Sequence, residues 1–299
     1  MYKMLKNFFP TFLIYDENIS EIPDDYQWFV TDTNAIIGIA KSDLSAKDAA
    51  MLSTFLTPYQ LTIPNPTDLE KLWKNRIHHS SSMPETSHEK FRFVYFSFPK
   101  NQIEPNIFRT AMYEFFSNPI PILWENEQEG ILIEQQGVQL EDSLTYDQIV
   151  DTLMSDLYVK TKFFIGPYLL DFKDLSNQYL SFIQLAKISA SYSDNPVITY
   201  VDAIPFRLVN QIPFEQRNQI SNLVLKEFQN DEEMLQTIWT FIQCNLNISL
   251  TAKKLYMHRN SLQYRIDKFF EKTGIDVRQF NQALTVYIAL LATMHKEPV

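Results

Sequence analysis

The chain has 299 residues, which is enough for two or three domains, each with its own buried core. Only 5 glycines are present, and no GxGxxG or GxxxxGK[ST] motif occurs, so the common glycine-rich phosphate loops are excluded. The net charge of −10 argues against non-specific nucleic-acid binding by the whole chain. Residues 246–299 nevertheless carry 8 Lys/Arg and 4 Asp/Glu, so a basic segment of +4 follows an acidic body of −14.

Compartment and membrane signals are weak. Cys244 is the only cysteine, so no intrachain disulfide can form, as is typical of a reducing compartment. The longest apolar runs, such as VYIALLA at 286–292, fall short of the roughly 18 residues that span a bilayer. The N-terminal MYKMLKNFFPTFLIY lacks a cleavage pattern and favours a buried strand over a signal peptide. We expect a cytoplasmic protein with no membrane partner.

Residues 1–77 predict a small α+β unit, with a sensory role as one interpretation. Strand-like segments occur at 12–15, 28–31 and 36–40. The stretches SAKD (45–48) and TDLE (67–70) have the form of capping boxes and should open two helices. The polar segment HHSSSMPETSHEK (78–90) is typical of a linker.

Residues 91–203 predict a second α+β domain. Strands are expected at 91–98, 120–124, 131–135, 162–170 and 197–201, and helices at 106–116, 143–159 and 174–192. The polar turn ENEQEG (125–130) should join the second and third strands in a hairpin. This order predicts a sheet with helices packed on it.

Residues 204–299 predict an all-helical domain. Helices are expected at 213–228, after a cap at Asp231, and at 277–294. The last of these should bury a stripe made of Val277, Phe280, Leu284, Ile288 and Leu291. Between them, residues 249–273 have the pattern of a helix-turn-helix.

In the helix-turn-helix, Ser249 is the expected N-cap of a first helix over Leu250–Tyr256, and Ala252 lets a neighbouring helix approach. His258 is the expected N-cap of a second helix over Arg259–Thr273, which Gly274 should end. The expected buried stripe of the second helix is Leu262, Ile266, Phe269 and Phe270.

The opposite face of the second helix predicts DNA contact. Arg259, Asn260 and Gln263 are of the types that bond bidentately to guanine and adenine edges in the major groove. Residues placed for phosphates are Ser261, Tyr264, Arg265 and Lys268 on this helix, and Lys253 and Lys254 on the preceding one. The alternative is an ordinary solvated helix face, the usual fate of single lysines.

A family resemblance rests on these residues. The pattern N-x-S-x-x-A-x-x-L-x-x-H-R-N-[ST]-L-x-Y-R, matched from Asn247 to Arg265, resembles the C-terminal helix-turn-helix of PucR/CdaR regulators over about 50 residues. The turn also resembles Fis-type domains, in which the positions of His258, Arg259, Ser261 and Tyr264 face DNA. The middle domain more loosely resembles a GGDEF-like domain. That resemblance implies a ferredoxin-like core, although ENEQEG offers no GG[DE]EF signature.

Three functions follow as hypotheses. The first is a sequence-specific DNA-binding transcription regulator of the PucR/CdaR type that acts as a homodimer and is tuned by a small-molecule effector. The second is an enzyme whose GGDEF-like domain turns over a nucleotide. The third is a partner-binding protein that no longer touches DNA. The first is favoured, so we expect no enzyme activity and no cofactor.

Other clusters of polar residues are weaker candidates. His78, His79 and His88 lack helical spacing and favour a solvated linker over a metal site. The carboxylates Asp142, Asp147, Asp151 and Asp156 favour an exposed helix face over a catalytic pair. Neither GxSxG nor HExxH occurs, so we expect no catalytic or metal site.

Overall fold

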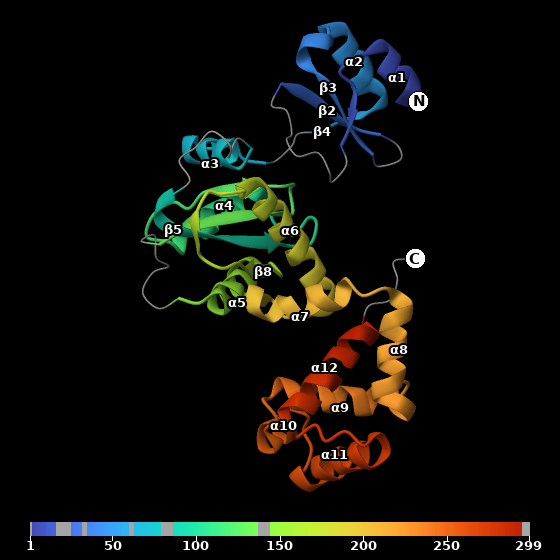
Figure 1. Ribbon diagram of the computed structural model, residues 1–299. Coiled ribbons are helices and arrows are strands. Elements are labelled where there is room, and N and C mark those ends of the chain that lie inside the picture. The colour runs from blue at the N-terminus through green and yellow to red at the C-terminus, as the bar shows by residue number, and fades with distance from the viewer. Residues whose placement is uncertain are drawn as a thin grey trace. The chain divides into compact units, whose positions relative to one another are not determined.

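The computed structural model describes residues 2–15, 25–31, 35–59, 63–78, 86–136 and 144–294. The chain divides into two compact units, Met1–Leu180 and Ser181–Val299 (Figure 1). The predicted fold class is confirmed: the molecule mixes helices with sheets, has several domains, and ends in a helical region with a helix-turn-helix. Within the described ranges, no helix combines the length and apolarity needed to cross a membrane.

A four-stranded antiparallel sheet near the N-terminus has the order β1-β3-β2-β4. Its elements are α1 (Tyr2–Phe8), β1 (Leu13–Ile14), β2 (Tyr26–Val30), β3 (Ile36–Ala40), η1 (Lys41–Asp43), α2 (Ala46–Phe55) and β4 (Thr57–Tyr59). The predicted capping box at α2 is confirmed. The Ser45 hydroxyl accepts from the Asp48 amide, and the Asp48 carboxylate accepts from the Ser45 amide. A small apolar core includes Phe29 and Ile37 from the sheet and Leu52 from α2.

The next helix, α3 (Asp68–His78), packs on the second sheet, although the sequence assigns it to the first predicted domain. The capping box of Thr67 with Glu70 forms as predicted. The same buried carboxylate accepts the backbone amide of Ile122, in β6 of the second sheet, at 3.0 Å. The Trp73 ring contacts that of Phe91 at 5.0 Å between centroids.

The second sheet has the antiparallel order β8-β5-β7-β6, with β9 also paired to β5. Its elements are β5 (Thr86–Ser97), α4 (Pro105–Glu114), β6 (Ile122–Trp124), β7 (Glu129–Gln135), α5 (Tyr146–Leu157), β8 (Lys162–Ile165), β9 (Leu169–Asp171) and α6 (Leu175–Tyr192). Among β5 to β8 the fourth strand lies beside the first and the third lies between first and second, which is the ferredoxin-like arrangement. The predicted hairpin and helices are present, although α4 and α5 end earlier than predicted, at Glu114 and Leu157.

Three boundary predictions here need correction. The linker expected over 78–90 is wrong at its end, because β5 begins at Thr86; residues 79–85, including His79, lie outside the described residues. The single strand expected at 162–170 is two strands, β8 and β9, separated at residues 166–168. The expected strand at 197–201 ends at Thr199, where a capping box with Asp202 starts the next helix.

A buried carboxylate ties the second sheet together. Glu134 on β7 accepts from Arg92 Nη2 with both oxygens, at 2.8 and 2.9 Å. The hydroxyl of Tyr168 donates to Oε1 at 2.8 Å, and that of Tyr146 donates to Oε2 at 2.9 Å. Burial, followed by the charge of Glu134, holds the pKa of Tyr146 well above its usual range. The network therefore joins β5, β7, α5 and the segment before β9.

The second unit is helical apart from β10. Beyond the end of α6 it contains β10 (Val197–Thr199), α7 (Tyr200–Asn210), α8 (Phe214–Leu225), η3 (Lys226–Phe228), α9 (Glu232–Gln243), α10 (Ile248–Lys254), α11 (Arg259–Thr273) and α12 (Phe280–Met294). The predicted cap of α9 is confirmed, since Asp231 accepts from the Met234 amide at 3.0 Å. One apolar core, which includes Phe241, Phe269 and Leu290, is shared by α8 to α12.

The stripe expected for the last helix is buried only in part. Val277 and Leu291 are buried as predicted. Phe280 and Leu284 are 73% and 46% exposed. The helix instead buries Ala283, Val286 and Leu290. Both faces of α12 are apolar, so periodicity alone does not choose between them. The small side chain of Ala283 lets the backbone of a neighbouring helix come close, which favours burial of that face.

Candidate nucleic-acid interface

The first helix of the candidate motif, α10, starts two residues earlier than predicted. Asn247, not Ser249, is the N-cap, and its Oδ1 accepts from the Leu250 amide at 3.0 Å. Ile248 packs against the core of the unit, which a start after Ser249 would leave outside the helix. The helix ends at Lys254, and Ala252 is buried, as expected for close helix packing.

A tight turn follows α10. Tyr256 has a left-handed backbone (φ 53°), and the Met257 amide donates back to the Ala252 carbonyl at 2.8 Å. The Tyr256 side chain is 97% exposed. The sequence places this residue inside the first helix, so its position at the tip of the turn was not anticipated. The signal was weak, because the left-handed region usually calls for Gly or Asn.

The second helix, α11, has the predicted ends. His258 caps it, its Nδ1 accepting from the Asn260 amide at 3.3 Å. Gly274 ends it with φ 77°, and its amide donates to the Phe270 carbonyl at 2.8 Å. Leu262, Ile266 and Phe269 are buried as predicted.

The prediction that Phe270 completes the buried stripe is wrong, because this side chain is 42% exposed. Thr273 is buried in its place. The i, i+4, i+7, i+11 spacing from Leu262 leads to Thr273, whereas Phe270 lies one position, about 100°, past the stripe.

The outward face of α11 holds most of the predicted contact residues. Arg259, Asn260 and Gln263 are exposed, and so are Ser261, Tyr264 and Lys268. Within the described part of the chain, their side chains make no hydrogen bond or ion pair. The same holds for Lys253 and Lys254 at the end of α10. This surface, which we call the α11 face, thus presents a row of cations, amides and hydroxyls to solvent.

Arg265 differs from the rest of the predicted set. Its guanidinium pairs with Glu233, and its Nη1 donates to Thr237 Oγ1 at 3.0 Å; both partners belong to α9. The Arg265 side chain is 26% exposed. In this structure it therefore fastens α11 to α9 beneath the α11 face.

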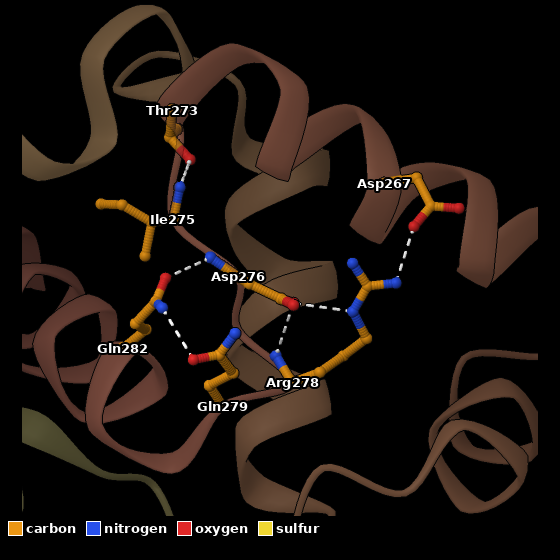
Figure 2. Close-up of polar contacts among 7 residues, drawn as sticks. All are labelled: Asp267, Thr273, Ile275, Asp276, Arg278, Gln279 and Gln282. Atoms are coloured by element: carbon orange, nitrogen blue, oxygen red, sulfur yellow. Dashed lines mark hydrogen bonds and ion pairs between the residues drawn. The ribbon is translucent and has the colours of Figure 1, made fainter.

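Arg278, in the loop before α12, holds the middle of α11, as Figure 2 shows. Its Nη1 donates to Asp267 of α11 at 2.8 Å, and its Nε donates to Asp276 at 2.7 Å. The side-chain hydrogen bond from Arg278 holds the pKa of the Asp276 carboxyl below its usual value. Gln282 of α12 accepts the Asp276 amide at 2.6 Å. Together with Arg265, these bonds fix α11 on both neighbouring helices.

This geometry coincides with a match to a protein family. Residues 234–292, from α9 to α12, match the model described as the PucR C-terminal helix-turn-helix domain. The resemblance predicted from Asn247 to Arg265 is confirmed.

Three curated relatives span different parts of the chain. An uncharacterized Bacillus subtilis (strain 168) protein, YxkF, is 29% identical over 90% of this chain and 92% of its own length. The carbohydrate diacid regulator of Escherichia coli (strain K12) is 35% identical over 22% of this chain and 17% of its own. The purine catabolism regulatory protein of B. subtilis (strain 168) is 28% identical over 56% of this chain and 30% of its own.

Proposed function

We propose that the chain is a sequence-specific DNA-binding regulator of transcription, because residues 234–292 match the model described as the PucR C-terminal helix-turn-helix domain. The observation that carries the proposal is the α11 face. Arg259, Asn260 and Gln263 are exposed and their side chains make no hydrogen bond or ion pair to a described residue, whereas the opposite side of the same helix is buried. A recognition helix needs one exposed polar face and one buried face. The exposed side chains leave water to bind base edges in the groove, and the buried side chains hold the helix in place.

The proposed contacts fall into two groups. Arg259, Asn260 and Gln263 read base edges in the major groove. The phosphate contacts are His258, Ser261, Tyr264, Lys268, Lys253 and Lys254, joined by Tyr256 from the turn. Arg265 acts as a positioning residue, because its guanidinium is already held by Glu233 and Thr237. The acidic remainder of the chain opposes non-specific binding and leaves recognition to this surface.

We further propose that the regulator is a homodimer. A single helix reads only a few base pairs, and two-fold pairing places two such helices in successive major grooves, about 34 Å apart. The exposed Phe280 and Leu284 on α12 support a dimer contact on that helix. Analytical ultracentrifugation of Phe280→Ser/Leu284→Ser should show a monomer where the parent chain is dimeric; an unchanged mass would remove this interface.

A nucleotide-handling enzyme finds less support. The GGDEF-like resemblance of the middle domain would place its signature in the turn at 125–130. There, Asn126 accepts the amides of Gln128 and Glu129, and Glu129 accepts the hydroxyl of Tyr95. These polar groups serve the hairpin itself. We propose that the domain is a structural or sensory part of a regulator that responds to a small molecule.

The test begins by selecting, from a random DNA library, a duplex that the full chain binds. Arg259→Ala should weaken binding to the selected duplex by about 10- to 100-fold, which corresponds to about 1–3 kcal/mol for a lost bidentate base contact. Binding to an unrelated duplex should change little. Arg207→Ala, which removes the same charge from the exposed surface of α7, is the matched control and should leave both affinities near the parent values.

Two results would overturn the proposal. One is that no duplex is enriched over the starting library. The other is that Arg259→Ala and Arg207→Ala weaken the selected and unrelated duplexes equally, since only general electrostatics would then be at work.

A further inference from the structure

The second unit contains a cavity of about 320 Å³ whose lining includes one proposed DNA contact, Lys254. Its lining includes Tyr192, Asp194, Asp202, Trp239, Lys254 and Tyr287. These residues come from the end of α6, the following loop, and helices α7, α9, α10 and α12. A ligand in this cavity would therefore touch three helices of the helix-turn-helix region at once. The volume is at the low end of ligand sites, which indicates a small molecule.

The apolar part of the lining is aromatic. The Trp239 and Tyr287 rings stack at 5.4 Å between centroids, and those of Tyr192 and Phe206 stack at 5.3 Å. All four rings belong to the lining of the cavity. Rigid aromatic walls of this kind suit a compact apolar or aromatic group.

The charged groups in the lining are of both signs and come from different segments. Asp194 lies in the loop before β10 and Asp202 in the first turn of α7, whereas Lys254 lies in the last turn of α10. Burial, followed by the charge of Asp202, raises the pKa of Tyr287, so this carboxylate acts on the cavity. Within the described ranges, Lys254 has no ion-pair partner.

A second cation, Arg217, acts on a residue of the cavity lining. Arg217 of α8 is only 7% exposed, and its Nε and Nη1 make no hydrogen bond to a described residue. Its charge acts on Tyr192, a lining residue, where it opposes the rise that burial causes in the pKa of that hydroxyl. A buried guanidinium with no carboxylate partner among the described residues is costly, and an anionic group in the cavity would lower that cost.

We propose that this cavity binds a small zwitterion of the α-amino-acid class, with its ammonium group at Asp202 and its carboxylate at Lys254. The side chain of the ligand lies between the aromatic rings. A ligand with an ammonium group but no carboxylate would give Lys254 no countercharge. A ligand with a carboxylate but no ammonium group would place a negative charge beside Asp194 and Asp202.

The site is coupled to DNA through Lys254, and this consequence rests on the proposed function. The same ammonium group is a proposed phosphate contact, so ligand and DNA compete for it. Bound ligand should lower DNA affinity and reduce the slope of log K against log salt by up to about one unit, which is the loss of one phosphate contact. By linkage, DNA should weaken ligand binding by the same factor.

Isothermal titration calorimetry with the full chain and no DNA tests the site by itself. The probes are the proteinogenic L-amino acids, with 2-phenylethylamine and 3-phenylpropanoate as versions of phenylalanine that lack the carboxylate or the ammonium. We expect at least one amino acid to bind, and each truncated version of it to bind at least about tenfold more weakly. If an aliphatic amino acid binds best, its own amine and acid analogues replace these two.

Paired variants locate the site. Lys254→Gln and Asp202→Asn should each weaken amino-acid binding by about tenfold, whereas Lys253→Gln, which alters the neighbouring lysine outside the cavity lining, should leave it unchanged. Binding of none of the amino acids, equal binding of the truncated versions, or equal effects of Lys253→Gln and Lys254→Gln would each overturn the proposal.

A DNA titration then separates this inference from the proposed function. On the selected duplex, the amino acid should weaken DNA binding by the parent chain but not by Lys254→Gln. If calorimetry shows amino-acid binding and no duplex is ever enriched, the ligand site is supported and the regulator proposal fails. If the duplex binds and no amino acid does, the cavity proposal fails alone.

Discussion

Two groups of polar side chains in this molecule are used in opposite ways. On the second sheet, Glu134 receives four hydrogen bonds from Arg92, Tyr146 and Tyr168, so a buried charge is satisfied within the chain. On the α11 face, Arg259 and Gln263 are exposed and make none to described residues. A polar group satisfied internally supports the fold, whereas a row of unengaged polar groups on a rigid helix is available to a partner.

The largest effect is expected where the buried group is disturbed. Glu134→Gln leaves the Arg92 guanidinium without a countercharge and turns an amide donor toward a tyrosine hydroxyl. Breaking a buried pair in this way costs about 3–5 kcal/mol. Urea unfolding, followed by far-ultraviolet circular dichroism, should show the first unit losing that much stability.

The matched control is Asp151→Asn on α5, an exposed carboxylate, which should stay within about 0.5 kcal/mol of the parent. Affinity for the selected duplex should be retained by both variants under folding conditions. A Glu134→Gln chain as stable as Asp151→Asn would show that the Glu134 network contributes nothing to stability.

The end of α11 offers a backbone test of how rigidly the α11 face is held. Gly274 has φ 77°, and a Cβ added there would meet no atom within 4 Å. Gly274→Ala should therefore cost about 1 kcal/mol from backbone conformation alone. Gly274→Asn should cost less, because Asn enters the left-handed region more readily. Equal losses in urea unfolding for both variants would point to a clash in place of backbone strain.

The ion pairs of Figure 2 supply a smaller, pH-dependent contribution. Since the folded-state pKa of Asp276 is lowered, its stabilisation is present above the unfolded value of about 4 and is lost as the pH falls through the folded value. Arg278→Gln should cost about 0.5–1 kcal/mol at pH 7, because Arg278 is partly exposed.

In urea unfolding, the difference between Arg278→Gln and the parent should shrink below about pH 4. A difference that stays constant from pH 7 to pH 3 would contradict the role of Asp276. Glu271→Gln, on an exposed side chain of α11, serves as the control.

Local signals in the sequence were sufficient for much of this architecture. The ends of α11 follow from a cap residue and a glycine whose backbone preferences act within one turn. The caps at Ser45, Thr67 and Asp231 follow for the same reason. The exposed positions of Arg259, Asn260 and Gln263 follow from the 3.6-residue period once the buried stripe is placed.

What the sequence did not determine depends on partners far away in the chain. Both faces of α12 are apolar, and only packing selects the one that carries Ala283 and Val286. The packing of α3 on the second sheet depends on a bond from the Ile122 amide to Glu70, 52 residues away. Arg265 has the residue type of a phosphate contact, and its engagement by Glu233 appears only when α9 and α11 are brought together.

The smallest expected effect decides the role of Arg265. Glu233→Gln removes the countercharge, and since Glu233 is 76% exposed, the cost in stability should be at most about 0.5–1 kcal/mol. If Arg265 positions α11, DNA affinity should fall by a few-fold and the salt slope should not change. If it is a phosphate contact held back by Glu233, affinity should rise and the slope should steepen by about one unit. Glu232→Gln, an exposed neighbour with no bond to α11, provides the reference for a simple change in net charge.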